Sequence, residues 1–94
     1  MQHILIIEDD RIIAESIEFI LEKDSFSCQW FNNGSESLNY LDNNKVDLIL
    51  LDVGLPDMSG FDVLRKVRIK SNIPVIIISA RDDESDQVLG LEGL

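Results

Sequence analysis

Short, uninterrupted apolar runs rich in branched residues recur along the chain, at residues 4–7, 48–51 and 75–78. None of them alternates with polar residues, as a strand with one exposed face would. The pattern is typical of strands that are covered on both faces, and such strands belong to parallel sheets. A buried helix segment can look similar, but flanking breakers such as Pro74 favour strands.

Hydrophobic residues recur at helical spacing over residues 11–23, and glutamates take the opposite side of the same segment. This spacing predicts an amphipathic helix. Asp10 is placed to cap its start, and Lys23 suits its end because the helix dipole favours a cation there. The residues expected on the buried stripe are Ile12, Ile13, Ile17, Ile20 and Leu21.

Weaker patterns predict the remaining elements. They are a strand over residues 26–31, a helix that follows Asn33 and ends at residues 43–44, a helix over residues 61–69 with its arginines and lysines exposed, and the start of a fourth helix over residues 82–94. Strands and helices thus alternate along the chain. This order requires parallel strands joined by right-handed crossovers, so the sequence predicts a doubly wound α/β domain.

Composition narrows the class of protein. The 94 residues suffice for one domain, and a hydrophobic fraction of 45% is too high for intrinsic disorder. A net charge of −10 repels nucleic-acid backbones and anionic membranes, and the apolar runs are too short to span a bilayer. The single cysteine, Cys28, excludes an internal disulfide. We expect a small cytoplasmic domain that binds neither nucleic acid nor membrane.

Carboxylates follow two of the predicted strands: Glu8 and Asp9 follow the first, and Asp52 ends the third. The carboxyl ends of parallel strands lie at one edge of the sheet, where ligands bind. A lone aspartate in such a place is more often a helix cap or turn former. Two acidic clusters at one edge, with the hydroxyl of Ser79 ending the next strand, are hard to assign to packing. Mg2+ or Mn2+ would relieve their mutual repulsion.

These residues resemble the response-regulator receiver domain of two-component signalling. The matching segments are residues 4–10, 47–61 and 73–81, and the middle one is highly specific. The similarity looks closest to receivers that precede a winged-helix DNA-binding domain. It implies a flavodoxin-like (CheY-like) fold, a sensor histidine kinase as partner, and a regulatory domain rather than an enzyme.

The resemblance also implies roles for single residues. Asp52 matches the aspartate that accepts the phosphoryl group. Asp9 matches the direct metal ligand, and Glu8 matches the acid that acts mostly through water. Gly54 matches the position whose backbone carbonyl completes the metal site, for which a glycine is sufficient.

Ser79 matches the switch hydroxyl that hydrogen-bonds a phosphoryl oxygen, and Ala80 matches the small neighbour that leaves room for the phosphate. The family's fifth-strand lysine, its aromatic partner and its last helix find no match. We therefore expect residues 1–94 to be a C-terminally truncated receiver of four βα units that lacks the fifth strand and last helix. The strand at residues 75–78 would then have a bare edge open to self-association.

The main hypothesis is a phospho-accepting receiver in which Asp52 takes a phosphoryl group from a histidine kinase with Mg2+, and so switches a transcriptional output absent from this chain. Attack by water at the same site is expected to reverse the modification. One alternative is a receiver-like interaction or dimerisation fragment that cannot be phosphorylated. The other is a metal-dependent phosphohydrolase, which usually needs a second acid two residues after the nucleophile, where Gly54 stands here.

Overall fold

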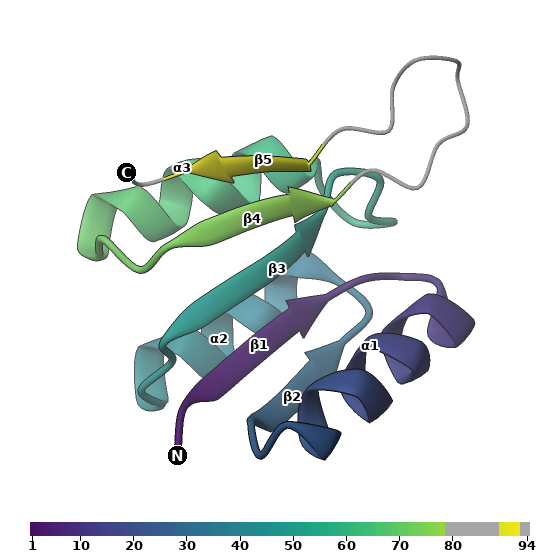
Figure 1. The fold of residues 1–94 in the computed structure, drawn as a ribbon. Coiled ribbons are helices and arrows are strands. Elements are labelled where there is room, and N and C mark those ends of the chain that lie inside the picture. Colours follow the sequence, from purple (N-terminus) through teal and green to yellow (C-terminus); the bar gives the residue numbers. More distant parts are fainter. Residues whose placement is uncertain (79–88, 93–94) are drawn as a thin grey trace.

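A five-stranded sheet runs through the computed structural model, which describes residues 1–78 and the backbone of residues 89–92 (Figure 1). The strands lie in the order β2-β1-β3-β4-β5. The first four are parallel and the fifth is antiparallel to β4. The strands are β1 (His3–Ile7), β2 (Ser27–Phe31), β3 (Leu48–Asp52), β4 (Val75–Ile78) and β5 (Leu89–Glu92). The parallel part confirms the doubly wound, flavodoxin-like fold.

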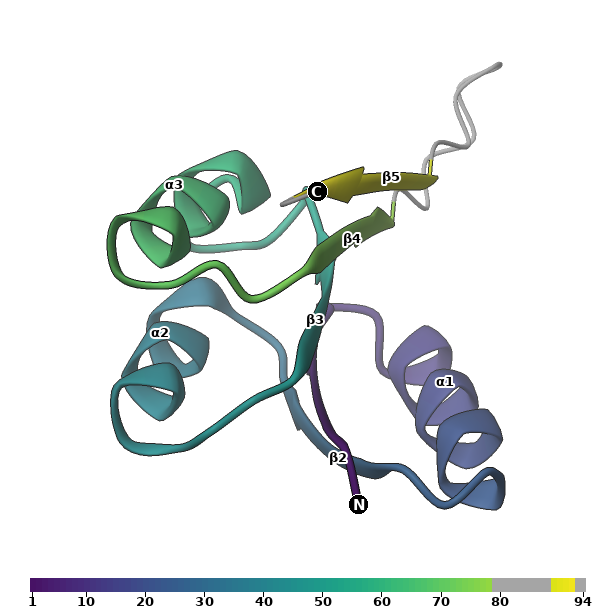
Figure 2. The same ribbon diagram turned by 60° about the vertical axis from the view of Figure 1, so that its left-hand side comes forward.

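Helices cover both faces of the sheet, as Figure 2 shows. One face is covered by α1 (Arg11–Lys23), and the other by α2 (Gly34–Asn43) and α3 (Gly60–Lys70). The sheet is therefore the middle layer of three.

None of the helices in the described part of the chain is long and apolar enough to cross a membrane.

The apolar strands supply two cores because successive strand residues point to opposite faces. On the side of α2 and α3, Leu5 and Ile7 pack with Ile49, Leu51 and Val63. The smaller core on the side of α1 is formed by Ile4, Ile6 and Ala14. Burying one such aliphatic side chain contributes about 1.5–3 kcal/mol. This two-sided burial explains why the runs show no polar alternation.

Each helix begins at a side chain that caps it. The Asp10 carboxylate accepts hydrogen bonds from the backbone N–H groups of Ile12 and Ile13, which confirms the predicted cap. Asn33 and Ser59 cap α2 and α3 in the same way. These caps fix where each helix begins after the chain leaves the carboxyl ends of the parallel strands.

The predicted apolar stripe of α1 is only partly correct. Ile17 and Leu21 pack with Ala14 against the sheet, whereas Ile12 and Ile20 are 76% and 60% exposed. At about 100° per residue, both isoleucines lie more than about 100° around the helix from Ala14. The side of α1 that faces the sheet is therefore centred on Ala14, Ile17 and Leu21.

The helix predicted over residues 82–94 is wrong at residues 89–92, which form β5. The backbone of β5 pairs with β4, with Ile77 opposite Gly90. The unpaired backbone groups of an edge strand favour such pairing. The β4 edge that we expected to be bare is thus occupied by a segment of the same chain.

The basic side of α3 was predicted to be fully exposed, and the structure differs from this prediction at one residue. Arg65 and Lys66 are exposed as predicted, but Arg68 is half-buried. Its guanidinium donates to the carbonyl of Ile73 at 2.7 Å and ties the end of α3 to the segment that leads into β4.

Candidate metal centre

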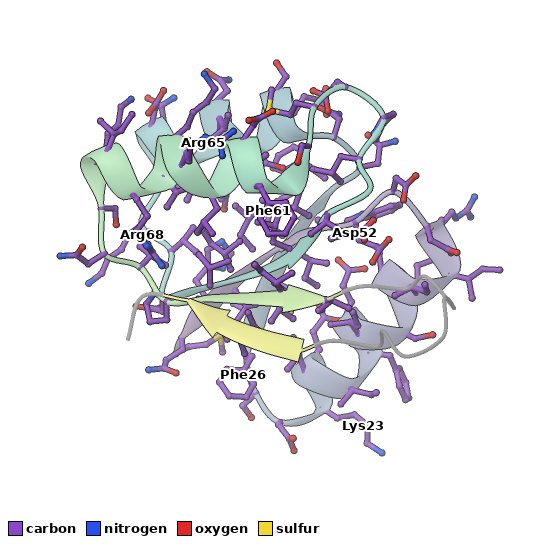
Figure 3. All side chains as sticks on the ribbon, turned by 90° about the horizontal axis from the view of Figure 1, so that it is seen from above. Lys23, Phe26, Asp52, Phe61, Arg65 and Arg68 are labelled. Atoms are coloured by element: carbon purple, nitrogen blue, oxygen red, sulfur yellow. The ribbon has the colours of Figure 1, made fainter. Side chains whose placement is uncertain are left out.

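Three carboxylates converge at the carboxyl edge of the parallel strands. Glu8 and Asp9 directly follow β1, and Asp52 is the last residue of the neighbouring strand β3. One carboxylate oxygen from each residue lies within 4.8 Å of the others. Figure 3 shows Asp52 at the end of the sheet to which β4 points. The predicted meeting of the two acidic clusters is confirmed.

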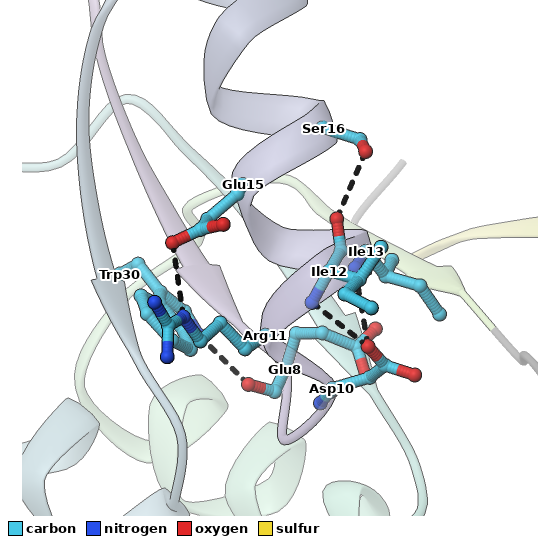
Figure 4. A network of polar contacts seen from close by, with 8 residues as sticks. All are labelled: Glu8, Asp10, Arg11, Ile12, Ile13, Glu15, Ser16 and Trp30. Carbon is cyan, nitrogen blue, oxygen red and sulfur yellow. Dashed lines mark hydrogen bonds and ion pairs between the residues drawn. The ribbon is translucent and has the colours of Figure 1, made fainter.

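The backbone of Glu8 is held on both sides. Its carbonyl accepts a hydrogen bond from the indole of Trp30 at 2.8 Å (Figure 4), and its N–H donates to the carbonyl of Phe31 at 3.1 Å. Trp30 packs on the α1 side of the sheet. In addition, it anchors the strand end from which Glu8 reaches into the site.

The Glu8 carboxylate lacks enough partners for its burial. Glu8 is 2% exposed, and its Oε2 accepts a hydrogen bond from the backbone N–H of Asp10, at 3.2 Å. Its Oε1 is buried with no hydrogen-bond partner among the described residues. An unpartnered buried polar atom costs about 1–3 kcal/mol. A cation shared with the neighbouring carboxylates would supply the missing partner.

The electrostatics of the pair point the same way. Burial raises the pKa of Glu8 to about 7, and the nearby charge of Asp52 adds to the shift, while the Asp10 N–H opposes it. Burial also raises the pKa of Asp52, and the charge of Asp9 contributes, while the backbone N–H of Gly54 acts in the opposite direction. Burial therefore disfavours the charged form of both acids, and added positive charge would favour it.

The donor set suits a small hard cation. All three side chains offer carboxylate oxygens, and Asp9 is exposed while Asp52 is 6% exposed. Mg2+ and Mn2+ prefer oxygen ligands and keep several waters, so a few protein ligands at an open edge are sufficient. The residues present thus fit a divalent ion of this class.

Two glycines shape the loop that follows Asp52. A Cβ on Gly60 would lie 2.6 Å from both the Asp52 carbonyl oxygen and the Val53 Cα, so only glycine fits where α3 begins. A Cβ on Gly54 would have the Asp52 Oδ2 as its nearest neighbour, at 3.9 Å. Gly54 therefore lies beside the acidic site without steric need for glycine.

Ser79 and Ala80, which were predicted to be site residues, lie outside the described residues. One residue that we did not predict enters the surroundings of the site. Asp57, in the loop between β3 and α3, accepts hydrogen bonds from the N–H groups of Gly34 and Ser35. Only its acidic character in a loop was visible in the sequence, and this gave no hint of contact with α2.

A doubly wound sheet with three carboxylates at the ends of two adjacent strands is the arrangement that the sequence predicted for a receiver domain. Residues 4–93 match the family described as the response regulator receiver domain, and the chain belongs to this family. Receiver domains are regulatory parts of two-component systems that interact with histidine kinases.

Curated relatives are regulators of longer chain. The sensory transduction protein RegX3 of Mycobacterium tuberculosis is 41% identical over 92 residues, which cover 98% of this chain and 40% of RegX3. The transcriptional regulatory protein CseB of Streptomyces coelicolor is 41% identical over 90 residues, 96% of this chain and 38% of CseB. The chain therefore spans about two fifths of the length of such relatives.

Solved structures agree on the fold. A CheY-like receiver from Methanospirillum hungatei superposes with a TM-score of 0.82 at 28% identity, covering 89% of this chain and 68% of that one. The response regulator TrrA of Thermotoga maritima, solved in complex with Mg2+-BeF, also gives 0.82 at 28% identity, with 87% and 72% covered.

Proposed function

We propose that this chain is a phospho-accepting receiver whose Asp52 takes a phosphoryl group from a sensor histidine kinase in a Mg2+-dependent reaction. The supporting observation is the buried, unpartnered Glu8 Oε1 within a trio of carboxylates that includes Asp52. In this proposal Glu8, Asp9, Asp52 and the backbone carbonyl of Gly54 hold the ion. The TrrA complex with Mg2+-BeF supports the choice of ion.

The transfer converts one phosphorylated side chain into another. An oxygen of the Asp52 carboxylate attacks phosphorus, the P–N bond to the kinase histidine breaks, and the released imidazole nitrogen takes up a proton. When bound, a divalent ion held by the acidic trio would supply positive charge to offset that of the carboxylates and of the incoming phosphoryl group. The protein mainly positions the groups, since phosphoryl transfer needs little covalent help.

The architecture keeps the acceptor in place. Asp52 is the last residue of a central strand, and its carbonyl lies under the tight turn at Gly60. Glu8 is fixed through its backbone by Trp30 and Phe31. A weak nucleophile thus gains by orientation what it lacks in reactivity.

We further propose that the Ser79 hydroxyl bonds a phosphoryl oxygen in the modified protein and that Ala80 leaves space for it. The added charge and acceptor oxygens would then reorganise the neighbouring surface. The output of this switch is proposed to be transcriptional and to lie in another part of a longer regulator, because the relatives include transcriptional regulators of more than twice this length.

Incubation with acetyl phosphate, with and without Mg2+, tests the proposal. We expect an Mg2+-dependent shift on a phosphate-affinity gel in the parent and no shift in Asp52→Ala. Peptide mass spectrometry should place the phosphoryl group on Asp52. No Asp52-dependent modification by acetyl phosphate or by a phosphorylated kinase would support the phosphorylation-incompetent interaction domain instead.

A further inference from the structure

Asp57 holds the loop after the phosphoryl acceptor against another helix. Its Oδ1 accepts from the N–H of Gly34 at 2.8 Å and its Oδ2 from the N–H of Ser35 at 2.9 Å. Gly34 and Ser35 are the first two residues of α2. The N–H groups of a first helical turn have no partner within the helix, and the helix dipole favours an anion there.

The start of α2 divides its donors between two caps. Its own cap, Asn33, accepts from the N–H of Glu36 at 2.8 Å, and the two preceding N–H groups go to Asp57. The Gly34 N–H lowers the pKa of Asp57, as does that of Ser35, so the carboxylate is ionised at neutral pH. Asp57 therefore completes the helix start from a segment more than 20 residues away.

We call the two hydrogen bonds from the N–H groups of Gly34 and Ser35 to Asp57 the Asp57 clasp. Packing of side chains reinforces it. A Cβ on Gly34 would lie 2.8 Å from the Met58 Cγ and 2.9 Å from its Sδ. Gly34 thus allows Met58, the residue after Asp57, to lie directly on the start of α2. The loop and the helix meet through one bidentate carboxylate and one close apolar contact.

The other end of the loop is closed on itself. The Gly60 N–H donates to the carbonyl of Val53 at 3.0 Å, and Gly54 forms a backbone bridge with Ser59. The loop from residue 53 to residue 59 is therefore pinned at its base beside Asp52 and at its tip by Asp57. Gly54 thus belongs to the paired base of the same loop whose tip Asp57 holds.

We propose that Asp57 is a positioning residue for the acidic site, which acts by clasping the loop after Asp52 to the N-terminus of α2. The inference rests on the proposed function, because it concerns the same ion and the same phosphoryl acceptor. Asp57 itself touches neither. It keeps the Gly54 backbone and the Asp52 carboxylate in the arrangement that the ion and phosphoryl group require.

The test compares Asp57→Ala and Asp57→Asn with two controls. Asp42→Ala removes an equal charge from α2. Asp42 lies away from the loop and pairs with Lys70, with 2.9 Å between its Oδ1 and the Lys70 Nζ. Asn33→Ala removes the helix's own cap and leaves the clasp intact. Each variant is measured by Mg2+ calorimetry, by the rate of labelling with acetyl phosphate at saturating Mg2+, and by urea unfolding.

We expect Asp57→Ala to weaken Mg2+ binding and slow labelling by about tenfold, the size of effect typical of residues that orient metal ligands. Asp57→Asn, which keeps one acceptor oxygen, should fall between this variant and the parent. Asp42→Ala should match the parent, and Asn33→Ala should lose stability without losing Mg2+ affinity. Amide exchange at Gly34 and Ser35 should accelerate most in the Asp57 variants, which remove the acceptor of these two N–H groups.

Equal Mg2+ affinity and labelling in Asp57→Ala and the parent would overturn the inference, as would an equal loss in Asn33→Ala. The proposed function fails separately if the parent is not labelled at Asp52. In that event the Mg2+ affinities of the four variants still decide the role of Asp57. A parent that binds no Mg2+ would overturn both.

Discussion

Glu8 is an acid placed where water cannot solvate it. It is 2% exposed, one of its oxygens has no partner among the described residues, and burial raises its pKa to about 7. Such an arrangement costs stability in the ion-free protein. Shifted acids of this kind are common at functional sites, where binding of a counter-ion recovers the cost.

The pH dependence of stability follows from this shift. A glutamate in the unfolded chain loses its proton near pH 4.5, whereas Glu8 in the folded protein keeps it until about pH 7. Between these values the folded state binds more protons, so the free energy of unfolding should fall as pH rises from about 5 to about 8, by roughly 2 kcal/mol. Urea unfolding at a series of pH values, in the presence of a chelator, measures this fall in the free energy of unfolding.

Glu8→Gln is the matched variant, because the amide has nearly the same shape and does not titrate. Its stability should vary less with pH than that of the parent over the same range, and at pH 8 it should be the more stable of the two without metal. A parent profile that rises across this interval would contradict the assignment.

Helices and strands that depend on local sequence signals could be predicted, whereas features that depend on tertiary contacts could not. The three parallel apolar runs and the cap at Asp10 could be predicted because they depend on burial on both faces and on a backbone donor two residues away. The exposure of Ile12 and Ile20 could not, since a helix with several isoleucines leaves its buried side to be chosen by the sheet. The helix predicted over residues 89–92 was wrong because the pairing of this segment with β4 is a contact that its own hydrophobic spacing does not encode.

The same distinction between predictable and unpredictable features holds for the acidic site. That Glu8, Asp9 and Asp52 meet follows from strand topology, which the element order gave. That one oxygen of Glu8 lacks a partner depends on every atom around it, and no spacing in the sequence encodes this. The clasp of Asp57 joins a loop to the start of α2, more than 20 residues away, and no periodicity encodes it, so it also needed the three-dimensional structure.

The turn between β3 and α3 gives a prediction at this scale. Gly60→Ala puts a methyl group 2.6 Å from the Asp52 carbonyl oxygen, and the backbone must move to accept it. We expect a loss of about 2 kcal/mol or more in urea unfolding, together with weaker Mg2+ binding. Gly54→Ala is the control, because the nearest atom to its methyl group among the described residues is the Asp52 Oδ2, at 3.9 Å, and the carbonyl is retained. Equal losses in both variants would contradict this account.

For the molecule as a whole, negative charge dominates. The sequence has 18 acidic and 8 basic side chains, and three of the acids crowd into one site. General repulsion is screened by any salt, with a Debye length of about 10 Å at 0.1 M. The repulsion inside the trio is short-range and partly buried, so ordinary screening reaches it poorly.

Two salts at matched ionic strength separate these effects. KCl should raise the stability of the chain modestly, and MgCl2 at the same ionic strength should add about 1 kcal/mol or more once Mg2+ exceeds its Kd about tenfold. Asp9→Asn should retain the response to KCl, since Asp9 is exposed, and lose most of the additional response to MgCl2. Thermal unfolding in both salts is the measurement, and an identical Mg2+ response in the variant would contradict the proposed ligand set.

The indole of Trp30 gives this domain an optical reporter of its own. It is the single tryptophan of the chain, and its N–H bonds the backbone of an acid in the site. Any displacement of that backbone changes the polarity sensed by the excited ring, and so the wavelength or intensity of its emission. Events at the acidic edge can thus be followed in real time in the unlabelled protein, with no dye to disturb them.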